Sequence, residues 1–205
     1  MRAINKIIVH YLGPKVPGLT MQDMTGQKAV DMIRGWHKAK GWLDIGYHYL
    51  IDCKGNILNG RPDYMVGAHC LNENYDSLGV NCLFFEGETP NELMINGLIK
   101  CLYELCQFYK LNPKTDIYGH RDFLATQCPD KIYPMLPDIR KKVLNYKEGE
   151  KVEEKQINKV NIDFKGSRIE GLLINSQSYI HVTEIAKILG LNVTFDKNKK
   201  LVIVK

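Results

Sequence analysis

The hydrophobic pattern of the first 146 residues contains several apolar runs that have the length of a buried strand. β-Branched and aromatic residues dominate these runs, and polar or glycine-containing segments separate them. The turn signal "CKGN" predicts that two of the runs form a hairpin. The predicted strands are "INKIIVHYL", "DIGYHYLID", "ILNGR", "SLGVNCLFFEG" and "TDIYGH".

Helical spacing of apolar residues alternates with these strands. One helix is expected to follow Thr25 as its N-cap and to end near Gly41. A second is expected to follow Thr89 as its N-cap, with Glu92 closing a capping box, and to run to about Lys110. "PDIRKKVLNY" predicts a closing helix. This alternation predicts an α/β fold with a central mixed β-sheet flanked by helices.

The pattern changes after residue 146, which predicts a second part of the chain. Residues 147–158 are highly charged with almost no apolar positions, which predicts a linker, with a solvated extension of the preceding helix as the alternative. Residues 159–205 predict a small α+β module with several strands and a helix in "TEIAKILG". We therefore expect a first domain over residues 1–146. A module this small has a marginal core, so we expect it to lean on that domain or to form a homo-oligomer.

Composition places the chain among ordinary globular proteins, with 44% hydrophobic and 25% charged residues. No run reaches the roughly 20 apolar residues that cross a bilayer, so no membrane span is expected. The first residues lack the apolar core of a secretory signal, which predicts a cytoplasmic location before any release. The six cysteines are spread along the chain and do not resemble a disulfide scaffold.

Charge is distributed unevenly along the chain. From Lys159 onward there are eight Lys or Arg against four Asp or Glu, whereas the preceding part has twenty against nineteen. The basic residues of this tail are few and are not interleaved with aromatic side chains, so no nucleic-acid partner is expected. The positive excess instead favours an anionic partner of another kind.

Three residues could form a metal centre. His10 stands at the end of the first predicted strand, His120 at the end of a later one, and Cys128 on a loop that Pro129 stiffens. Two imidazoles and a thiolate with an open fourth position are typical of a catalytic zinc site. Taken alone, a histidine at a strand end or a single cysteine is more often structural.

Four motifs that appear in order strengthen the zinc reading: "IIVHY", "GWHKAKGWLDIGYHYLID", "GAHCLNENYDSLGVNCL" and "YGHRDFLATQCPD". From about Ile4 to Val143 the chain resembles the zinc-dependent N-acetylmuramoyl-L-alanine amidases of the phage-lysozyme and peptidoglycan-recognition-protein family (amidase type 2). The resemblance implies that His10, His120 and Cys128 bind Zn²⁺. It also implies that the substrate is bacterial peptidoglycan, cleaved between the lactyl group of N-acetylmuramic acid and L-alanine.

The resemblance implies roles for three more residues. Tyr47, in "GYHYL", matches the catalytic tyrosine, which would donate to the developing oxyanion. Thr126 stands where some phage members carry Lys, and its hydroxyl can donate a hydrogen bond but brings no charge. His69, in "GAHC", matches a position at the groove and is expected to bind substrate.

Several neighbouring residues are expected to act indirectly or not at all. Strand alternation predicts Tyr47 and Tyr49 on one face and His48, a structural residue, on the other. His37 matches a family position but is expected to be a packing residue or a residue that supports the site from behind, not a catalytic one. Asp122 is expected either to accept a hydrogen bond from a ligand imidazole or to cap its own loop.

The tail has a resemblance of its own. "SYIHVTEIAKILGLNVTFDKNKKLVIVK" is similar to the stalk-type repeat named after the N-terminal domain of copper amine oxidases, which occurs in bacterial wall-associated proteins. No copper chemistry follows, because His181 stands alone. Lys197, Lys199, Lys200 and Lys205 would favour anionic wall polymers as partners. An oligomerisation or stability element is the alternative.

Two rival functions fit parts of the pattern. A non-catalytic peptidoglycan receptor would share the fold, but such members typically lack the zinc cysteine, which this chain has as Cys128. A Cys–His hydrolase with Cys128 as nucleophile and His120 as base would leave His10 unexplained. We therefore expect an amidase that acts on the cell wall after its release, as an endolysin or an autolysin.

Overall fold

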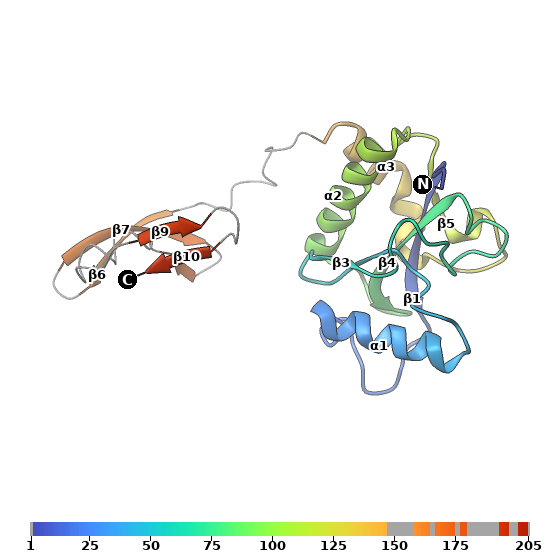
Figure 1. Ribbon diagram of the computed structural model, residues 1–205, viewed down its shortest axis with the longest axis horizontal. Helices are drawn as coiled ribbons and strands as arrows, with labels where there is room; N and C mark the ends of the chain where they lie inside the picture. The colour runs from blue at the N-terminus through green and yellow to red at the C-terminus, as the bar shows by residue number, and fades with distance from the viewer. Residues whose placement is uncertain are drawn as a thin grey trace. The chain divides into compact units, whose positions relative to one another are not determined.

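The computed structural model describes residues 2–146, 158–164, 167–174, 177–179, 193–196 and 201–204. The chain divides into two compact units, Met1–Glu150 and Lys151–Lys205 (Figure 1). The predicted division into domain, linker and module is compatible with this boundary. The functions assigned to these parts stay predictions.

The first unit is built on one sheet of five strands. In chain order these are β1 (Lys6–Gly13), β2 (Tyr49–Ile51), β3 (Ile57–Asn59), β4 (Ser77–Phe85) and β5 (Ile117–Gly119). Their order across the sheet is β3-β2-β4-β1-β5. All neighbouring pairs are parallel except the β2–β3 hairpin, which is antiparallel. The predicted mixed central sheet is therefore confirmed.

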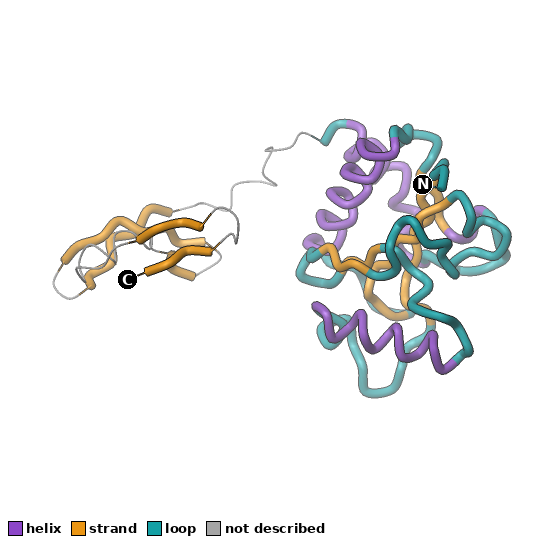
Figure 2. The backbone as a smooth tube through the Cα atoms, viewed as in Figure 1, coloured by secondary structure: helices purple, strands orange, loops and turns teal. Residues whose placement is uncertain are grey.

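Helices cover both faces of this sheet (Figures 1 and 2). Helix α1 (Gly26–Ala39) lies on one face, and helices α2 (Glu92–Tyr109) and α3 (Leu136–Leu144) lie on the other. Short 3₁₀ helices, η1 (His120–Asp122) and η2 (Asp130–Met135), connect β5 to α3. Across the residues that the structure describes, no helix combines the length and apolarity needed to cross a membrane.

The central strands explain the apolar runs of the sequence. Every residue of β4 is buried, as expected for a parallel strand covered on both faces. Along β1, Ile7, Val9 and Tyr11 belong to the apolar cluster on the α2 side. Side chains alternate along a strand, so His10 points to the other face, and its side chain is 1% exposed.

The predicted start of the second helix is wrong by two residues. The N-cap of α2 is Asn91, whose side chain accepts a hydrogen bond from the Met94 N–H at 2.9 Å. Its amide nitrogen also donates to the Cys53 carbonyl at 2.8 Å. Asn91 therefore caps the helix and ties it to the β2–β3 turn, and Thr89 lies outside the helix.

The predicted common face for Tyr47 and Tyr49 is also wrong. Tyr49 packs against the cluster on the α2 side, whereas Tyr47 packs against the cluster on the α1 side. The reason is that β2 begins only at Tyr49, so the chain at Tyr47 does not follow strand alternation. His48 is buried, in agreement with its structural reading.

The second unit contains two small sheets in its described part. Strands β6 (Asn158–Phe164), β7 (Ser167–Ile174) and β8 (Gln177–Tyr179) pair in that order, and all pairs are antiparallel. Strands β9 (Val193–Asp196) and β10 (Leu201–Val204) form the predicted antiparallel hairpin. The predicted helix in "TEIAKILG", His181 and the four tail lysines lie outside the described residues.

Candidate metal centre

The sheet brings His10 and His120 together. Val9 of β1 is paired with Gly119 of β5, so the residues that follow them, His10 and His120, become neighbours. The centroids of the two imidazole rings lie 4.6 Å apart. The parallel pairing of two strands more than a hundred positions apart thus builds one side of the candidate site.

The loop after His120 folds back and brings Cys128 to the same place. The Arg121 N–H donates to the Cys128 carbonyl at 2.9 Å, and the Arg121 guanidinium donates to the Gln127 carbonyl. Cys128 is buried, and its Sγ lies 3.6 Å from Nδ1 of His10. The eight-residue spacing between His120 and Cys128 is therefore the length of a closed loop whose two ends meet.

The three residues have the arrangement of a metal site. One ligand atom each from His10, His120 and Cys128 lies within 4.8 Å of the other two. Nε2 of His120 is buried and has no hydrogen-bond partner among the residues that the structure describes. Burial raises the pKa of the Cys128 thiol to about 12, so a cation that replaces its proton would compensate a costly buried charge.

This donor set fits zinc. Two imidazole nitrogens and one thiolate sulfur are among the ligands that zinc prefers, and three protein ligands leave a position open for substrate or water. His10, His120 and Cys128 are the predicted ligand set, and their binding of zinc stays a prediction.

Tyr47 lies beside the cluster. Its ring centroid is 5.3 Å from that of His10 and 5.5 Å from that of His37. Burial raises the pKa of the Tyr47 phenol above its ordinary value, so the hydroxyl keeps its proton and remains a donor. Nδ1 of His37 accepts the Gly46 N–H at 2.9 Å, which holds the loop that carries Tyr47. Of the two roles expected for His37, this contact favours support of the site over packing alone.

Thr126 supports the cysteine loop. Its Oγ1 accepts a hydrogen bond from the Cys128 N–H at 3.2 Å. The hydroxyl hydrogen is not used in this contact, so it stays available to a ligand. The predicted catalytic role of Thr126 stays a prediction.

His69 is packed beneath His10. Its side chain is 7% exposed, and its Nδ1 lies 3.1 Å from Nε2 of His10. This burial favours a supporting role over direct contact with substrate, and the predicted substrate contact stays a prediction. Ser77 touches the far side of the His69 ring. No sequence pattern points to Ser77, because it is the first residue of an apolar strand.

Asp122 caps its own loop. One carboxylate oxygen accepts the Gly119 N–H at 2.8 Å, and the other accepts the Tyr133 hydroxyl at 2.5 Å. Of the two roles expected for Asp122, the structure thus favours the loop cap.

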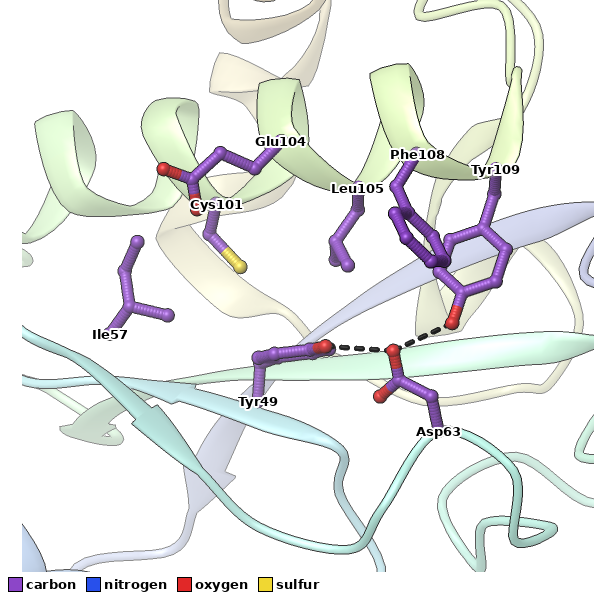
Figure 3. Close-up of a pocket in the computed structure, with 8 residues that line it drawn as sticks. All are labelled: Tyr49, Ile57, Asp63, Cys101, Glu104, Leu105, Phe108 and Tyr109. Atoms are coloured by element: carbon purple, nitrogen blue, oxygen red, sulfur yellow. Dashed lines mark hydrogen bonds between the residues drawn. The ribbon is translucent and has the colours of Figure 1, made fainter. Parts of the chain in front are cut away.

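A separate pocket lies on the α2 side of the sheet (Figure 3). Tyr49 and Tyr109 both point to the carboxylate of Asp63, and each hydroxyl donates to it at 2.7 Å. These bonds fasten the loop after β3 to the end of α2. His10 faces the opposite side of the sheet, so this pocket is not part of the candidate metal centre. The pocket is lined by Tyr49, Ile57, Asp63, Cys101, Glu104, Leu105, Phe108 and Tyr109.

Comparison with known proteins gives the site a family context. The endolysin of Enterobacteria phage T3 is 49% identical over 106 residues, which cover 47% of this chain and 66% of the endolysin. The endolysin of Enterobacteria phage K11 is 38% identical over 107 residues, with the same coverage. The chain therefore spans just under two thirds of the length of these relatives.

A solved structure has the same architecture. The N-acetylmuramoyl-L-alanine amidase LysC from Clostridium intestinale URNW matches with a TM-score of 0.56 and 28% identity, over 71% of this chain and 88% of that chain. Residues 1–131 match the Amidase_2 family, described as N-acetylmuramoyl-L-alanine amidase. Since this match covers more than half of the 205 residues, the chain belongs to the N-acetylmuramoyl-L-alanine amidase family.

Proposed function

We propose that this protein is a peptidoglycan hydrolase. It cleaves the amide bond between the lactyl group of N-acetylmuramic acid and the L-alanine of the stem peptide. The observation that carries the proposal is the meeting of His10, His120 and Cys128, whose ligand atoms lie within 4.8 Å of one another. Membership of the amidase family and similarity to phage endolysins support the same reaction, with the bacterial cell wall as its place of action.

Zinc is the metal that we propose for this centre, held by His10, His120 and Cys128. When bound in an open site of this kind, zinc acts as a Lewis acid on a carbonyl oxygen and activates water. The burial of His10 and Cys128 supports this assignment, because electrostatic interactions are stronger where water is excluded.

The protein supplies hydrogen-bond donors around the reacting amide. Tyr47 lies against His10 and stays protonated, so its hydroxyl donates to the carbonyl oxygen as negative charge develops there. We propose the same role for the free hydroxyl hydrogen of Thr126. The hydrogen bond from Gly46 to His37 keeps the Tyr47 loop in place before substrate arrives.

Metal analysis and product identification test the proposal together. The purified full chain should contain one zinc ion, and digestion of bacterial walls should release stem peptides with a free L-alanine amino terminus. Chelation should stop this release, and added zinc should restore it. A zinc-loaded chain that leaves the walls intact would refute hydrolysis and favour a receptor. Activity that resists chelation but is lost on thiol alkylation would favour a Cys–His hydrolase.

Replacing the ligand sulfur gives a sharper test. Cys128→Ser should lower zinc binding and amidase activity to background, because a hydroxyl replaces a thiolate ligand. Cys106→Ser is the matched control, since Cys106 is also a buried free cysteine but lies in α2. It should bind zinc as the parent does. Full wall-lytic activity in Cys128→Ser would refute the ligand assignment.

A further inference from the structure

The ring of His69 occupies a slot made by two glycines. A Cβ atom at Gly79 would lie 2.5 Å from the His69 ring, and one at Gly67 would lie 2.6 Å from it. Any other residue at either position would push the ring away. The absence of side chains at Gly67 and Gly79 thus lets the His69 imidazole lie against the backbone. Its Nδ1 lies 3.1 Å from Nε2 of His10.

The Glu73 backbone carbonyl determines which group donates and which accepts in the hydrogen bonds that link Ser77 to His69. The Ser77 hydroxyl lies 2.5 Å from the carbonyl oxygen of Glu73. A carbonyl oxygen only accepts hydrogen bonds, so Ser77 donates its hydrogen there. Oγ of Ser77 is then left as an acceptor for Nε2 of His69, 3.4 Å away. His69 therefore carries its proton on Nε2.

The same assignment of donors and acceptors extends from His69 to His10. A neutral His69 with its proton on Nε2 has a bare Nδ1, which accepts a hydrogen bond. The group that faces it is Nε2 of His10, at 3.1 Å. His10 must then carry its proton on Nε2, and its Nδ1, which lies 3.6 Å from Cys128 Sγ, keeps a free lone pair.

We infer that His69, Ser77 and the Glu73 carbonyl form a positioning chain for the metal centre: they hold His10 in the tautomer whose Nδ1 is free for the ion. The inference rests on the proposed zinc site and adds residues that act through His10. A ligand histidine whose second ring nitrogen is hydrogen-bonded is oriented and made more basic, and loss of such a partner typically costs 10–100-fold in metal affinity.

The neighbouring histidine, His48, has its ring centroid 5.6 Å from that of His69 but makes its own hydrogen bonds. Nδ1 of His48 accepts the Gly79 N–H at 3.0 Å, and its Nε2 lies 3.1 Å from the Met65 carbonyl. The structure records no hydrogen bond between His48 and His10 within its described residues. His48 is therefore buried beside the chain without belonging to it, which makes it a suitable control.

The tautomers are measurable without zinc or substrate. In the zinc-free full chain, long-range ¹H–¹⁵N NMR should show both His10 and His69 protonated on Nε2. A His10 that carries its proton on Nδ1 would overturn the inference, whether or not the variants below fold. Because this readout needs no amidase activity, its failure is distinguishable from failure of the proposed function, which would appear as a parent chain that binds no zinc.

Two substitutions of His69 test whether this residue affects zinc binding. His69→Leu removes the acceptor and should weaken zinc binding about 10–100-fold in a chelator competition. It should also leave His10 as a mixture of tautomers. His69→Asn places an amide oxygen near the former Nδ1, so it should largely restore both the Nε2-protonated His10 and the zinc affinity. The cobalt-substituted protein should change its visible spectrum in His69→Leu and not in His69→Asn.

His48→Leu is the matched control, because it also removes a buried imidazole from this part of the sheet. It should lower stability while leaving zinc affinity at the parent value. A folded His69→Leu with parental zinc affinity would overturn the inference, as would equal losses in His69→Leu and His48→Leu. If His69→Leu does not fold, His69→Asn and the NMR of the parent still decide.

Discussion

Neighbouring residues hold the loops that carry Cys128 and Tyr47 in place. Thr126 and Arg121 close the loop of Cys128, and His37 holds the loop of Tyr47. Such support matters because a donor displaced by about 1 Å can cost a hundredfold in rate. At this scale, the proposed activity depends on such loop contacts as well as on the groups that would meet the substrate.

Removing one oxygen atom from Tyr47 separates its proposed role in the reaction from any role in metal binding. Tyr47→Phe keeps the ring beside His10 and removes only the hydroxyl, so zinc content should not change. Loss of a donor to an oxyanion typically lowers kcat about 100–1,000-fold. Turnover of a defined muramyl peptide, together with metal analysis, checks both parts. An unchanged kcat would remove Tyr47 from the reaction.

His48 makes the stability of the zinc-free protein depend on pH. Burial lowers its pKa from 6.5 to about 4 in the folded protein. Between these values the unfolded chain binds a proton that the folded chain does not, so stability falls as pH falls through this window. The contribution is at most about 1.4 kcal/mol per pH unit.

Urea unfolding in a chelator at pH 7, 6 and 5 measures this dependence. His48→Asn is the informative variant, because its amide oxygen can still accept the Gly79 N–H but does not titrate. Its stability should fall less steeply than that of the parent across the same range. Equal slopes for the two proteins would show that His48 does not titrate in this window.

The sequence could indicate the candidate metal ligands but not the residues that hold them in place. His10, His120 and Cys128 lie in motifs that can be recognised along the chain. The contact of His69 with Ser77 forms because this end of β4 faces the loop that precedes the strand. A local sequence pattern does not show this arrangement. The sequence therefore predicts a groove residue at His69, whereas the structure shows that its ring is buried.

At the scale of elements, strands were predicted better than the ends of helices. Apolar runs reveal a buried strand directly, because both of its faces must be apolar. Thr89 and Asn91 are both good N-caps, and the local sequence does not show that Asn91 also reaches the Cys53 carbonyl. The same limit applies to Tyr47, which local alternation assigned to a strand that begins later.

The two possible caps of α2 can be compared directly. Asn91→Ala removes the acceptor for the Met94 N–H and should destabilise the protein by about 1 kcal/mol. Thr89→Ala should stay within about 0.5 kcal/mol of the parent, because Thr89 lies before the helix. Thermal or urea unfolding of the three proteins gives the comparison, and a larger loss for Thr89→Ala would reverse the assignment.

At the scale of the whole molecule, the second unit carries an excess of basic residues. We propose that it helps to hold the enzyme on anionic wall polymers, given eight basic against four acidic residues from Lys159 onward. A chain that ends at Glu150 should keep its zinc and sediment less with purified walls than the full chain does.

Salt separates electrostatic binding from other kinds. Wall binding of the full chain should weaken between low and high ionic strength, because screening shortens the reach of charge. Truncated protein that sediments as well as the full chain, at every salt concentration, would exclude wall anchoring and leave oligomerisation or stability as the role of the second unit.

The order of strands has a consequence for how the enzyme is made. Strand β1 is synthesised first but lies between β4 and β5, and the last of the three candidate ligands follows at Cys128. A nascent chain that ends before residue 117 lacks one neighbour of β1 and two of the three ligands. Under the proposed function, an unfinished chain on the ribosome therefore has no lytic activity, and the cell wall meets an active enzyme only after translation has passed Cys128.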